Sequence, residues 1–267
     1  MIRRSVLFAI VTLVMAGMVS SAFAAGQFSS FSISPSPITT PVFGGYENDL
    51  KIGATYLTMK SSGTTTVGRE FELDGYGITA AGRSAFSDQI AVDYAIGVIY
   101  LNGDMGAGKV MELDGVSVPI SVNLEVQPYK NNVFNVIVFA GPAFSISSMR
   151  LDDVPAVFRT TVVRDSWDID SYLYGLQGGV QLGFRLGDVH LDFFGMADRK
   201  LGTQDITKTF SPNTSESISA FTTTSYGLDL LYVPWGLSLG SILQEARQRD
   251  NNRTRTDIYT ISWSHRF

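Results

Sequence analysis

The stretch YTISWSHRF at residues 259–267 places an apolar or aromatic residue at every second position up to a final phenylalanine. A period of two is the repeat of a β-strand, because successive side chains point to opposite faces. Only one face of this strand is apolar, which suits a strand with lipid on its outer side. The stretch therefore predicts a membrane-embedded strand, whose apolar row consists of Tyr259, Ile261, Trp263 and Phe267.

The other end of the chain has the features of an export signal. Arg3 and Arg4 precede an apolar run over residues 6–19, and small residues around Ala24 form an A-x-A cleavage pattern. The apolar run is shorter than the ~20 residues that a spanning helix needs. We therefore expect residues 1–24 to be a signal peptide, used in Sec export and then removed.

The composition of the chain is typical of a β-sheet protein embedded in a membrane. It is 45% hydrophobic and 17% charged, it has no cysteine, and its net charge is −5. No second apolar run is long enough for a spanning helix. In lipid every backbone polar group needs an internal partner, so a membrane protein without such helices must be a closed barrel. Negative charge and export both argue against a nucleic-acid partner.

About ten segments alternate in the way that transmembrane barrels require, with ~10 residues each. They lie near residues 47–60, 70–86, 90–100, 110–127, 134–140, 172–184, 189–193, 226–232, 237–243 and 259–267. The prediction is an all-β protein, a transmembrane antiparallel up-and-down barrel over residues 46–267. Merging or missing weak segments would give eight or twelve strands.

The connections between these segments alternate in length. The short ones are residues 87–89, 128–132, 187–188 and 233–236, and the long ones are 60–69, 102–109, 147–167, 199–219 and 248–254. Short periplasmic turns and longer extracellular loops are typical of outer-membrane barrels. This pattern predicts that both ends of the barrel segment lie in the periplasm.

Taken together, the signal peptide, the alternating segments and the final aromatic strand resemble the small, OmpA-like or porin-like β-barrel class of the Gram-negative outer membrane. The resemblance implies an outer-membrane location, with membrane lipid and lipopolysaccharide as surroundings. It also implies that the barrel-assembly machinery recognises the row of Tyr259, Ile261, Trp263 and Phe267. A monomer is expected.

Residues 25–45 do not follow the alternation. Pro35, Pro37 and Pro41 forbid a central strand in this segment. Two interpretations stay open, a periplasmic tail or a partial plug that folds into the barrel.

Charged residues gather on the inward rows near the periplasmic strand ends. They are Lys51, Arg83, Asp93, Glu125, Arg185, His190, Asp192, Asp229 and Arg266. Pairing about the short turns sets Arg83 opposite Asp93 and Arg185 opposite His190, and cross-strand neighbours stand ~5 Å apart. Unpaired charges in a narrow lumen are costly, so a closed ionic network is expected.

Small residues such as Gly53, Gly75, Gly97 and Gly179 occupy the inward rows above these charges. They predict a roomier upper half, which is either a packing solution for a narrow barrel or a cavity that opens outward. A ten-strand barrel is only slightly wider than the eight-strand size that side chains fill.

The sequence offers little catalytic chemistry. Both histidines, His190 and His265, are expected near the periplasm, so a Ser-His-Asp arrangement at the outer surface is hard to build. We expect no enzyme, cofactor or metal site.

Arginine side chains bind phosphate in two-pronged fashion, so the outer arginines could contact lipopolysaccharide. These arginines are Arg247, Arg249, Arg253 and Arg255.

Three functions remain open. The favoured one is a non-enzymatic narrow pore or small-ligand conduit with a salt-bridged periplasmic constriction. The alternative is a structural or surface-interaction barrel that acts through its extracellular loops, in adhesion or lipopolysaccharide contact. The third, less favoured, is a lipid- or peptide-modifying enzyme.

Overall fold

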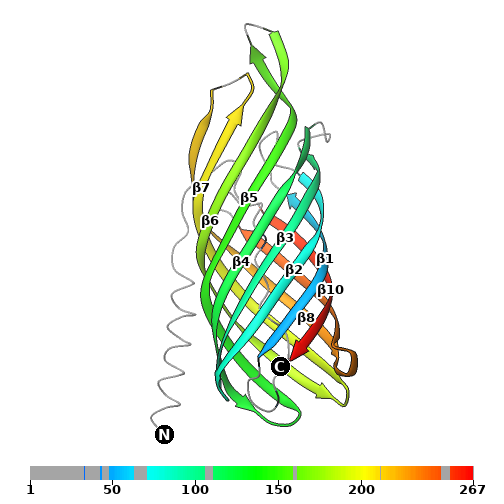
Figure 1. Cartoon of the computed structure of the whole chain (residues 1–267). Coiled ribbons are helices and arrows are strands. Elements are labelled where there is room, and N and C mark those ends of the chain that lie inside the picture. The colour runs from blue at the N-terminus through cyan, green and yellow to red at the C-terminus, as the bar shows by residue number, and fades with distance from the viewer. Residues whose placement is uncertain are drawn as a thin grey trace.

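The computed structural model describes residues 33, 43, 48–62, 71–105, 111–158, 161–210, 212–247 and 253–266. Ten antiparallel strands follow one another around a closed barrel, and β1 pairs with β10 to complete it (Figure 1). This confirms the up-and-down barrel and the strand number predicted from the sequence. The expected signal peptide, residues 1–24, lies outside the described residues, and only Ile33 and Phe43 are described from residues 25–45.

The strands are β1 (Asp49–Ser62), β2 (Phe71–Ser87), β3 (Ile90–Met105), β4 (Met111–Lys130), β5 (Phe134–Phe158), β6 (Thr161–Leu186), β7 (Val189–Lys208), β8 (Thr214–Tyr232), β9 (Leu237–Arg247) and β10 (Arg253–Arg266). A short 3₁₀ turn, η1 (Val233–Trp235), joins β8 to β9. No helix among these residues is long and apolar enough to cross a membrane.

Tight turns join the strands at one end of the barrel, where β10 also ends. They comprise residues 88–89, 131–133, 187–188 and 233–236. The side chain of Asn131 accepts hydrogen bonds from the backbone N–H groups of Val133 and Phe134 at 2.8 and 2.7 Å. Gly187 adopts the left-handed conformation, with φ of 65°. Short turns of this kind are periplasmic in outer-membrane barrels, and we assign this end to the periplasm.

The outer surface carries a broad apolar band. It begins at the tight turns and ends in a ring of tyrosines. The ring contains Tyr56, Tyr76, Tyr172, Tyr174, Tyr226 and Tyr259, which are all about half exposed or more. A band of this kind, closed by an aromatic girdle, is the surface that a barrel presents to lipid.

Beyond the tyrosines the polarity of the two faces reverses. The outward positions become charged, as at Asp74, Asp114 and Arg150, while the inward positions become apolar. Leucine, isoleucine and methionine side chains from several strands meet there in one buried cluster. Its outer members are Leu57, Met59, Leu73, Leu101, Met105, Met111, Leu113, Met149, Leu151, Ile169 and Ile206. The outer part of the barrel is thus built like a water-soluble barrel, with its own apolar core.

Two of the long loops predicted from the sequence are therefore much shorter in the structure, because the strands on either side of them are longer. Residues 147–167 belong almost entirely to β5 and β6, which have 25 and 26 residues and are joined by residues 159–160. Residues 199–219 lie mostly in β7 and β8. The strands continue because the period of two continues, but its apolar row changes face where water replaces lipid. A spanning strand needs only ~9–11 residues, so β5 and β6 rise far above the band (Figure 1).

This orientation gives a first testable prediction. An epitope inserted at Gly187-Asp188 should be hidden from antibody in intact cells, because that turn faces the periplasm. The same epitope inserted beside Pro212, in the β7–β8 connection, should be accessible. Labelling of intact and permeabilised cells distinguishes the two sites, and surface labelling at Gly187-Asp188 would overturn the orientation.

Candidate functional site

The periplasmic half of the lumen contains two strong ion pairs. Lys51 Nζ lies 2.7 Å from Asp229 Oδ2, which joins β1 to β8 across the interior. Arg83 and Glu125 form a two-pronged pair, with Nε to Oε2 at 2.6 Å and Nη2 to Oε1 at 3.0 Å. Both side chains of the second pair are fully buried. Such a pair is costly to form unless its geometry satisfies both charges, as this one does.

Amide side chains extend this network between the strands. Asp93 lies directly opposite Arg83 in the β2–β3 register, as predicted. Asn123 Nδ2 donates to Asp93 Oδ1 at 2.7 Å, and Gln177 Nε2 donates to Asn123 Oδ1 at 3.0 Å. This chain links three strands, β3, β4 and β6, and passes over β5, which lies between β4 and β6.

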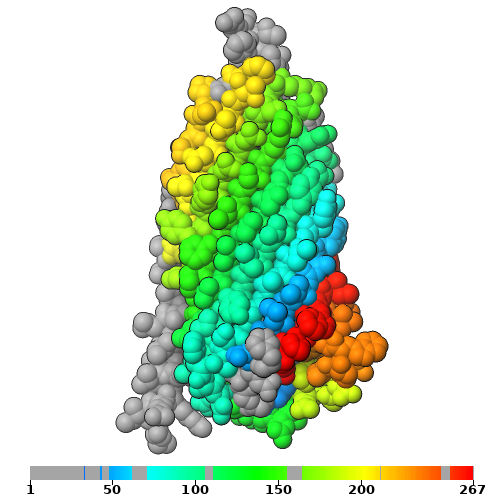
Figure 2. Space-filling model, viewed as in Figure 1, coloured from blue at the N-terminus to red at the C-terminus, as the bar shows by residue number. Residues whose placement is uncertain are grey.

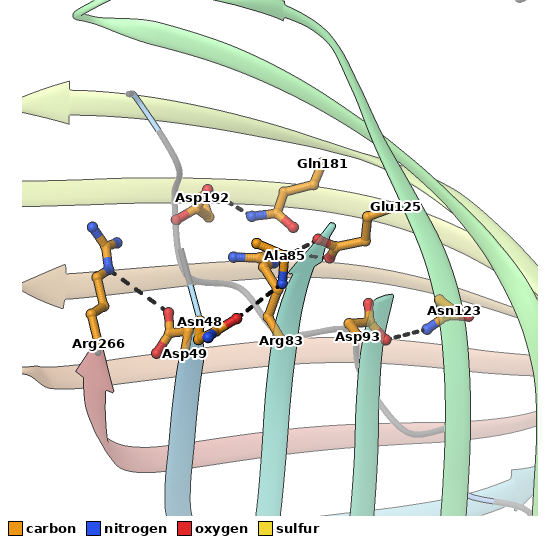
Figure 3. A network of polar contacts seen from close by, with 10 residues as sticks. All are labelled: Asn48, Asp49, Arg83, Ala85, Asp93, Asn123, Glu125, Gln181, Asp192 and Arg266. Atoms are coloured by element: carbon orange, nitrogen blue, oxygen red, sulfur yellow. Dashed lines mark hydrogen bonds and ion pairs between the residues drawn. The ribbon is translucent and has the colours of Figure 1, made fainter. Parts of the chain in front are cut away.

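A second bridge of the same kind joins β6 to β7, where Gln181 Nε2 donates to Asp192 Oδ1 at 3.0 Å (Figure 3). Asn123, Gln177 and Gln181 were not predicted, because only charged groups were considered. Asn123 occupies the inward row of β4 with Glu125, and Gln177 and Gln181 occupy the inward row of β6 with Gly175 and Gly179, so the alternation of the strands could have identified them.

At the periplasmic rim the expected network is only partly present. Arg266 Nε lies 3.8 Å from Asp49 Oδ2 (Figure 3). Ser264 Oγ donates to Asp49 Oδ1 at 2.9 Å. Asp49, which the sequence analysis omitted, is buried on the same inward row as Lys51. Arg185 pairs in register with His190 as predicted, but its side chain is exposed and lies outside the buried network. His190 is buried, and its ring lies 4.8 Å from that of Phe43.

A separate buried ion pair lies higher on β7. Lys200 Nζ is 3.0 Å from Asp198 Oδ2, and both side chains are fully buried. Both occupy the inward row of β7. The sequence predicted an extracellular loop from residue 199 onward, so the Lys200–Asp198 pair was not predicted.

The roomier upper half predicted from small residues is present only in part. Gly53, Ala95 and Gly97 line a cavity, but large side chains lie over other inward glycines. A Cβ atom on Gly75 would lie 2.6 Å from Leu101 Cδ2, and one on Gly179 would lie 2.7 Å from Phe139 Cζ. These two glycines make room for the apolar cluster.

A cavity of about 70 Å³ remains between the ion pairs and the apolar cluster. Lys51 and Asp229 border it on the periplasmic side, and Gly97, Ile258 and Ile33 line its walls. Ligand pockets usually measure ~300–1,000 Å³, so this space is too small for an ordinary organic ligand. Within the described residues, charged and apolar side chains close the lumen at two levels.

The two histidines both lie near the periplasmic end. His190 follows the turn at residues 187–188, and His265 near the end of β10 stacks on Trp263 with ring centroids 5.4 Å apart. Neither is at the outer rim, where the sequence analysis looked for a base. Among the described residues no group of three or more His, Cys, Asp or Glu side chains could hold a metal ion.

The outer arginines are exposed and partly neutralised. Arg247 Nη2 lies 3.5 Å from Glu245 Oε2, and Arg255 Nη2 lies 3.0 Å from Asp257 Oδ1. Arg253 is exposed at the start of β10, and Arg249 lies outside the described residues. In the expected assembly row, Tyr259, Ile261 and Trp263 are about half exposed on the outer face, and Phe267 lies outside the described residues.

The outer ends of β6, β7 and β8 are held together by Asp165, which is 1% exposed. Its Oδ1 accepts from the backbone N–H groups of Ser166, Thr209 and Phe210 at 2.9, 3.0 and 3.0 Å. Its Oδ2 accepts from Trp167 Nε1 at 3.1 Å, and Lys208 Nζ lies 4.8 Å from the centre of a Trp167 ring. One carboxylate therefore fixes the β7–β8 connection against β6.

Replacing Asp165 with alanine should loosen this outer end. The three N–H groups are part-buried, so the loss of the shared acceptor should cost toward the lower end of about 1–3 kcal/mol per group, and 1.4 kcal/mol is a factor of about ten. Amide hydrogen exchange at Thr209 and Phe210 should accelerate at least about tenfold, while the lipid-facing strands stay protected. Asp168→Ala, an exposed change on the same strand, is the control. Unchanged exchange at residues 209–210 would contradict the role of Asp165.

No protein-family model and no curated protein sequence matches the chain. Solved structures do. The outer membrane protease OmpT from Escherichia coli superposes with a TM-score of 0.57 at 11% identity, over 85% of this chain and 99% of that one. OprG from Pseudomonas aeruginosa reaches a TM-score of 0.39 at 13% identity, over 84% and 98% of the two chains. The attachment invasion locus protein Ail of Yersinia pestis reaches 0.37 at 12%, over 82% and 100%.

At these identities the similarity shows the fold alone. The closed ring of ten strands, the apolar outer band and the charged interior agree with it. The chain therefore has the fold of the bacterial outer-membrane β-barrels, with ten strands, and the apolar band on its outer face agrees with an outer-membrane location.

Proposed function

We propose that this protein is a non-enzymatic surface-interaction barrel, which holds a rigid folded platform above the outer membrane. The observation that carries the proposal is the reversal of polarity beyond the tyrosine ring. There β1 to β7 continue around an apolar core of their own and present a charged outer face. A chain that served only to span the membrane would need no such extension. The Asp165 contacts keep this platform ordered, as a binding surface requires.

The outer face of the platform favours a cationic partner. Glu72, Asp104, Glu112 and Asp152 stand directly opposite one another in the registers of β2 to β5. Like charges placed directly across a sheet are unfavourable. The outer two are paired, Glu72 with Lys60 at 2.6 Å and Asp152 with Arg150 at 3.1 Å. A hydrogen bond from Ser166 and the charge of Arg150 hold the pKa of Asp152 below its ordinary value.

Binding of a cationic probe tests this proposal. The purified barrel in nanodiscs should bind polylysine, and the triple change Asp104→Asn, Glu112→Gln and Asp152→Asn should weaken binding at least about tenfold, since several charge contacts of ~0.5–1 kcal/mol are lost. The matched control neutralises Glu245 and Asp257 on β9 and β10, and should leave binding within about twofold. Equal effects of the two sets would count against an acidic platform on β2 to β5.

Lipopolysaccharide contact through Arg247, Arg253 and Arg255 remains part of the proposal. These arginines lie just beyond the tyrosine ring, where lipid phosphates are found, and arginine binds phosphate in two-pronged fashion. Their in-strand partners Glu245 and Asp257 compete for them. Such contact would anchor the barrel in the outer leaflet beneath its platform.

A small-ligand conduit is the second candidate function. The cavity above the Lys51–Asp229 pair favours it, together with the two described residues of the 25–45 segment. Ile33 is 2% exposed within the apolar cluster, and Phe43 packs against His190. Both positions support a partial plug rather than a periplasmic tail. In this alternative the plug and the ion pairs would have to move for a solute to pass.

A further inference from the structure

A second hollow lies at the periplasmic rim, outside the lumen. It measures about 340 Å³ and is lined by the β8–β9 turn and the end of β10. Trp235 and Trp263 form its aromatic walls, and Ser264, His265 and Arg266 form its polar side. In Figure 2 the orange atoms of the β8–β9 turn stand beside the red atoms of the end of β10. Its volume falls in the ~300–1,000 Å³ range of ligand sites.

The backbone holds this groove in shape. Pro234 lies within the 3₁₀ turn, and Gly236 closes the turn with φ of 64° and donates to Val233 O at 3.1 Å. The Ser264 N–H donates to Gly236 O at 2.7 Å, which ties the turn to β10. A Cβ atom on Gly236 would lie 2.3 Å from Ser264 O, so only glycine allows this approach. The groove is therefore preformed and does not depend on a ligand to assemble it.

The chemistry of the groove is amphipathic. Trp263 is 49% exposed on the lipid-facing row with Ile261, so the groove opens directly onto the acyl region. On the other side, His265 stacks on Trp263, and the Arg266 side chain is 34% exposed. Asp49 approaches Arg266 at 3.8 Å from the lumen and so helps to orient the guanidinium group. A fitting ligand has an acyl chain joined to an anionic head.

We propose that this groove binds an anionic phospholipid of the periplasmic leaflet, with its phosphate on Arg266 and an acyl chain along Trp263. The guanidinium fork matches phosphate geometry. Tryptophan suits the boundary between headgroup and acyl chain, because one part of its ring system is apolar and its N–H is polar. The proposal is independent of the surface-interaction function, since it concerns the opposite end of the barrel.

Quenching of tryptophan fluorescence by brominated lipid tests the site. The chain has three tryptophans, so the double variant Trp167→Phe, Trp235→Phe leaves Trp263 as the reporter, and the phenylalanine at position 235 keeps an aromatic ring in the groove wall. It is reconstituted in vesicles of phosphatidylcholine and phosphatidylglycerol at equal mole fractions, with bromine on the acyl chains of one lipid or of the other. Brominated phosphatidylglycerol should quench Trp263 at least twofold more strongly. Equal quenching by the two lipids would overturn the proposal.

Substitutions then locate the preference. Arg266→Gln in the reporter background should abolish the difference between the lipids, whereas Arg185→Gln, which removes an exposed cation of the same rim outside the groove, should preserve it. Loss of the difference in both variants would mean general rim charge and no groove site. If Arg266→Gln does not assemble, Arg266→Lys replaces it as the test variant, because it keeps the charge. The preference of the lysine variant for phosphatidylglycerol should vanish between 0.1 and 1 M salt, since exposed charges are screened. A preference that survives 1 M salt would overturn the phosphate contact.

Discussion

Glu125→Ala is expected to destabilise the barrel by about 3–5 kcal/mol, because it leaves a buried guanidinium without its partner. Arg83 and Glu125 are both fully buried, and two contacts of 2.6 and 3.0 Å join them. The nearby Asp93 stands opposite Arg83, but its Oδ1 accepts from Asn123 and its Oδ2 makes no hydrogen bond to any described residue, so it does not contact the guanidinium group in this arrangement. The loss should appear as a lower urea midpoint for unfolding of the refolded barrel in lipid vesicles.

Two further variants separate a buried pair from a general effect of charge. The double change Arg83→Met, Glu125→Leu should recover much of the loss, since uncharged residues of similar volume remove both desolvated charges. Glu72→Ala breaks the exposed pair with Lys60 and should cost only ~0–1 kcal/mol. Equal, small effects of Glu125→Ala and Glu72→Ala would mean that water reaches Arg83 and that the periplasmic half is open.

Leu113→Ala is expected to cost about 2–5 kcal/mol, the usual range for a buried leucine in a packed core. Leu113 is fully buried in the apolar cluster, beyond the tyrosine ring, and pairs in register with Leu151. Its neighbour Glu112 points outward to water. Glu112→Ala should therefore change the unfolding free energy by no more than about 0.5 kcal/mol.

This pair of variants tests the reversal of polarity directly. If residues 111–114 formed a solvated loop, as the outer position of this segment could suggest, both changes would be small and similar. A large effect at Leu113 with none at Glu112 requires a packed interior above the membrane. Denaturation in vesicles, monitored by the mobility difference between folded and unfolded barrel on gels, measures both.

The sequence predicted the membrane-embedded part of the fold because lipid imposes a simple rule there. An outward apolar row, as in β3 from Ile90 to Tyr100, identifies the strand, and short turns fix the register. The opposition of Arg83 and Asp93 was predicted by centring the hairpin on Asp88, and a register shift between Ala85 and Ser87 produces it. The strand depends on local pattern alone, whereas the register also depends on this irregularity.

The platform was missed for a physical reason. Where β5 and β6 leave the lipid, water surrounds them, and the apolar row moves to the inward face at Met149, Leu151 and Ile169. A prediction that follows only the outward apolar row ends the strand at this point, because the outward residues become polar there. The tight pairing of β5 and β6 up to Phe158 and Thr161 shows that the period matters more than the face that carries it.

The sequence predicted which residue types line the lumen better than it predicted their contacts. The alternation of side chains placed most of the charges inside, but Arg185 is exposed. The partners within the network depend on distances across the lumen and not along the chain, since Lys51 meets Asp229 from a strand that is far away in sequence. Gly75 and Gly179 were misinterpreted because their sequence positions do not show that Leu101 and Phe139 lie over them.

Planar-bilayer recording of the mature full-length barrel tests the central claim most directly. Charged side chains close the periplasmic half of the lumen and an apolar cluster closes the outer half, so insertion should add no stable conductance in 1 M salt. Insertion must be confirmed independently, by protease protection of the same membranes. Absence of single-channel steps is the result that a sealed surface-interaction barrel predicts. Reproducible steps of defined size from the unmodified protein would contradict it and favour the conduit.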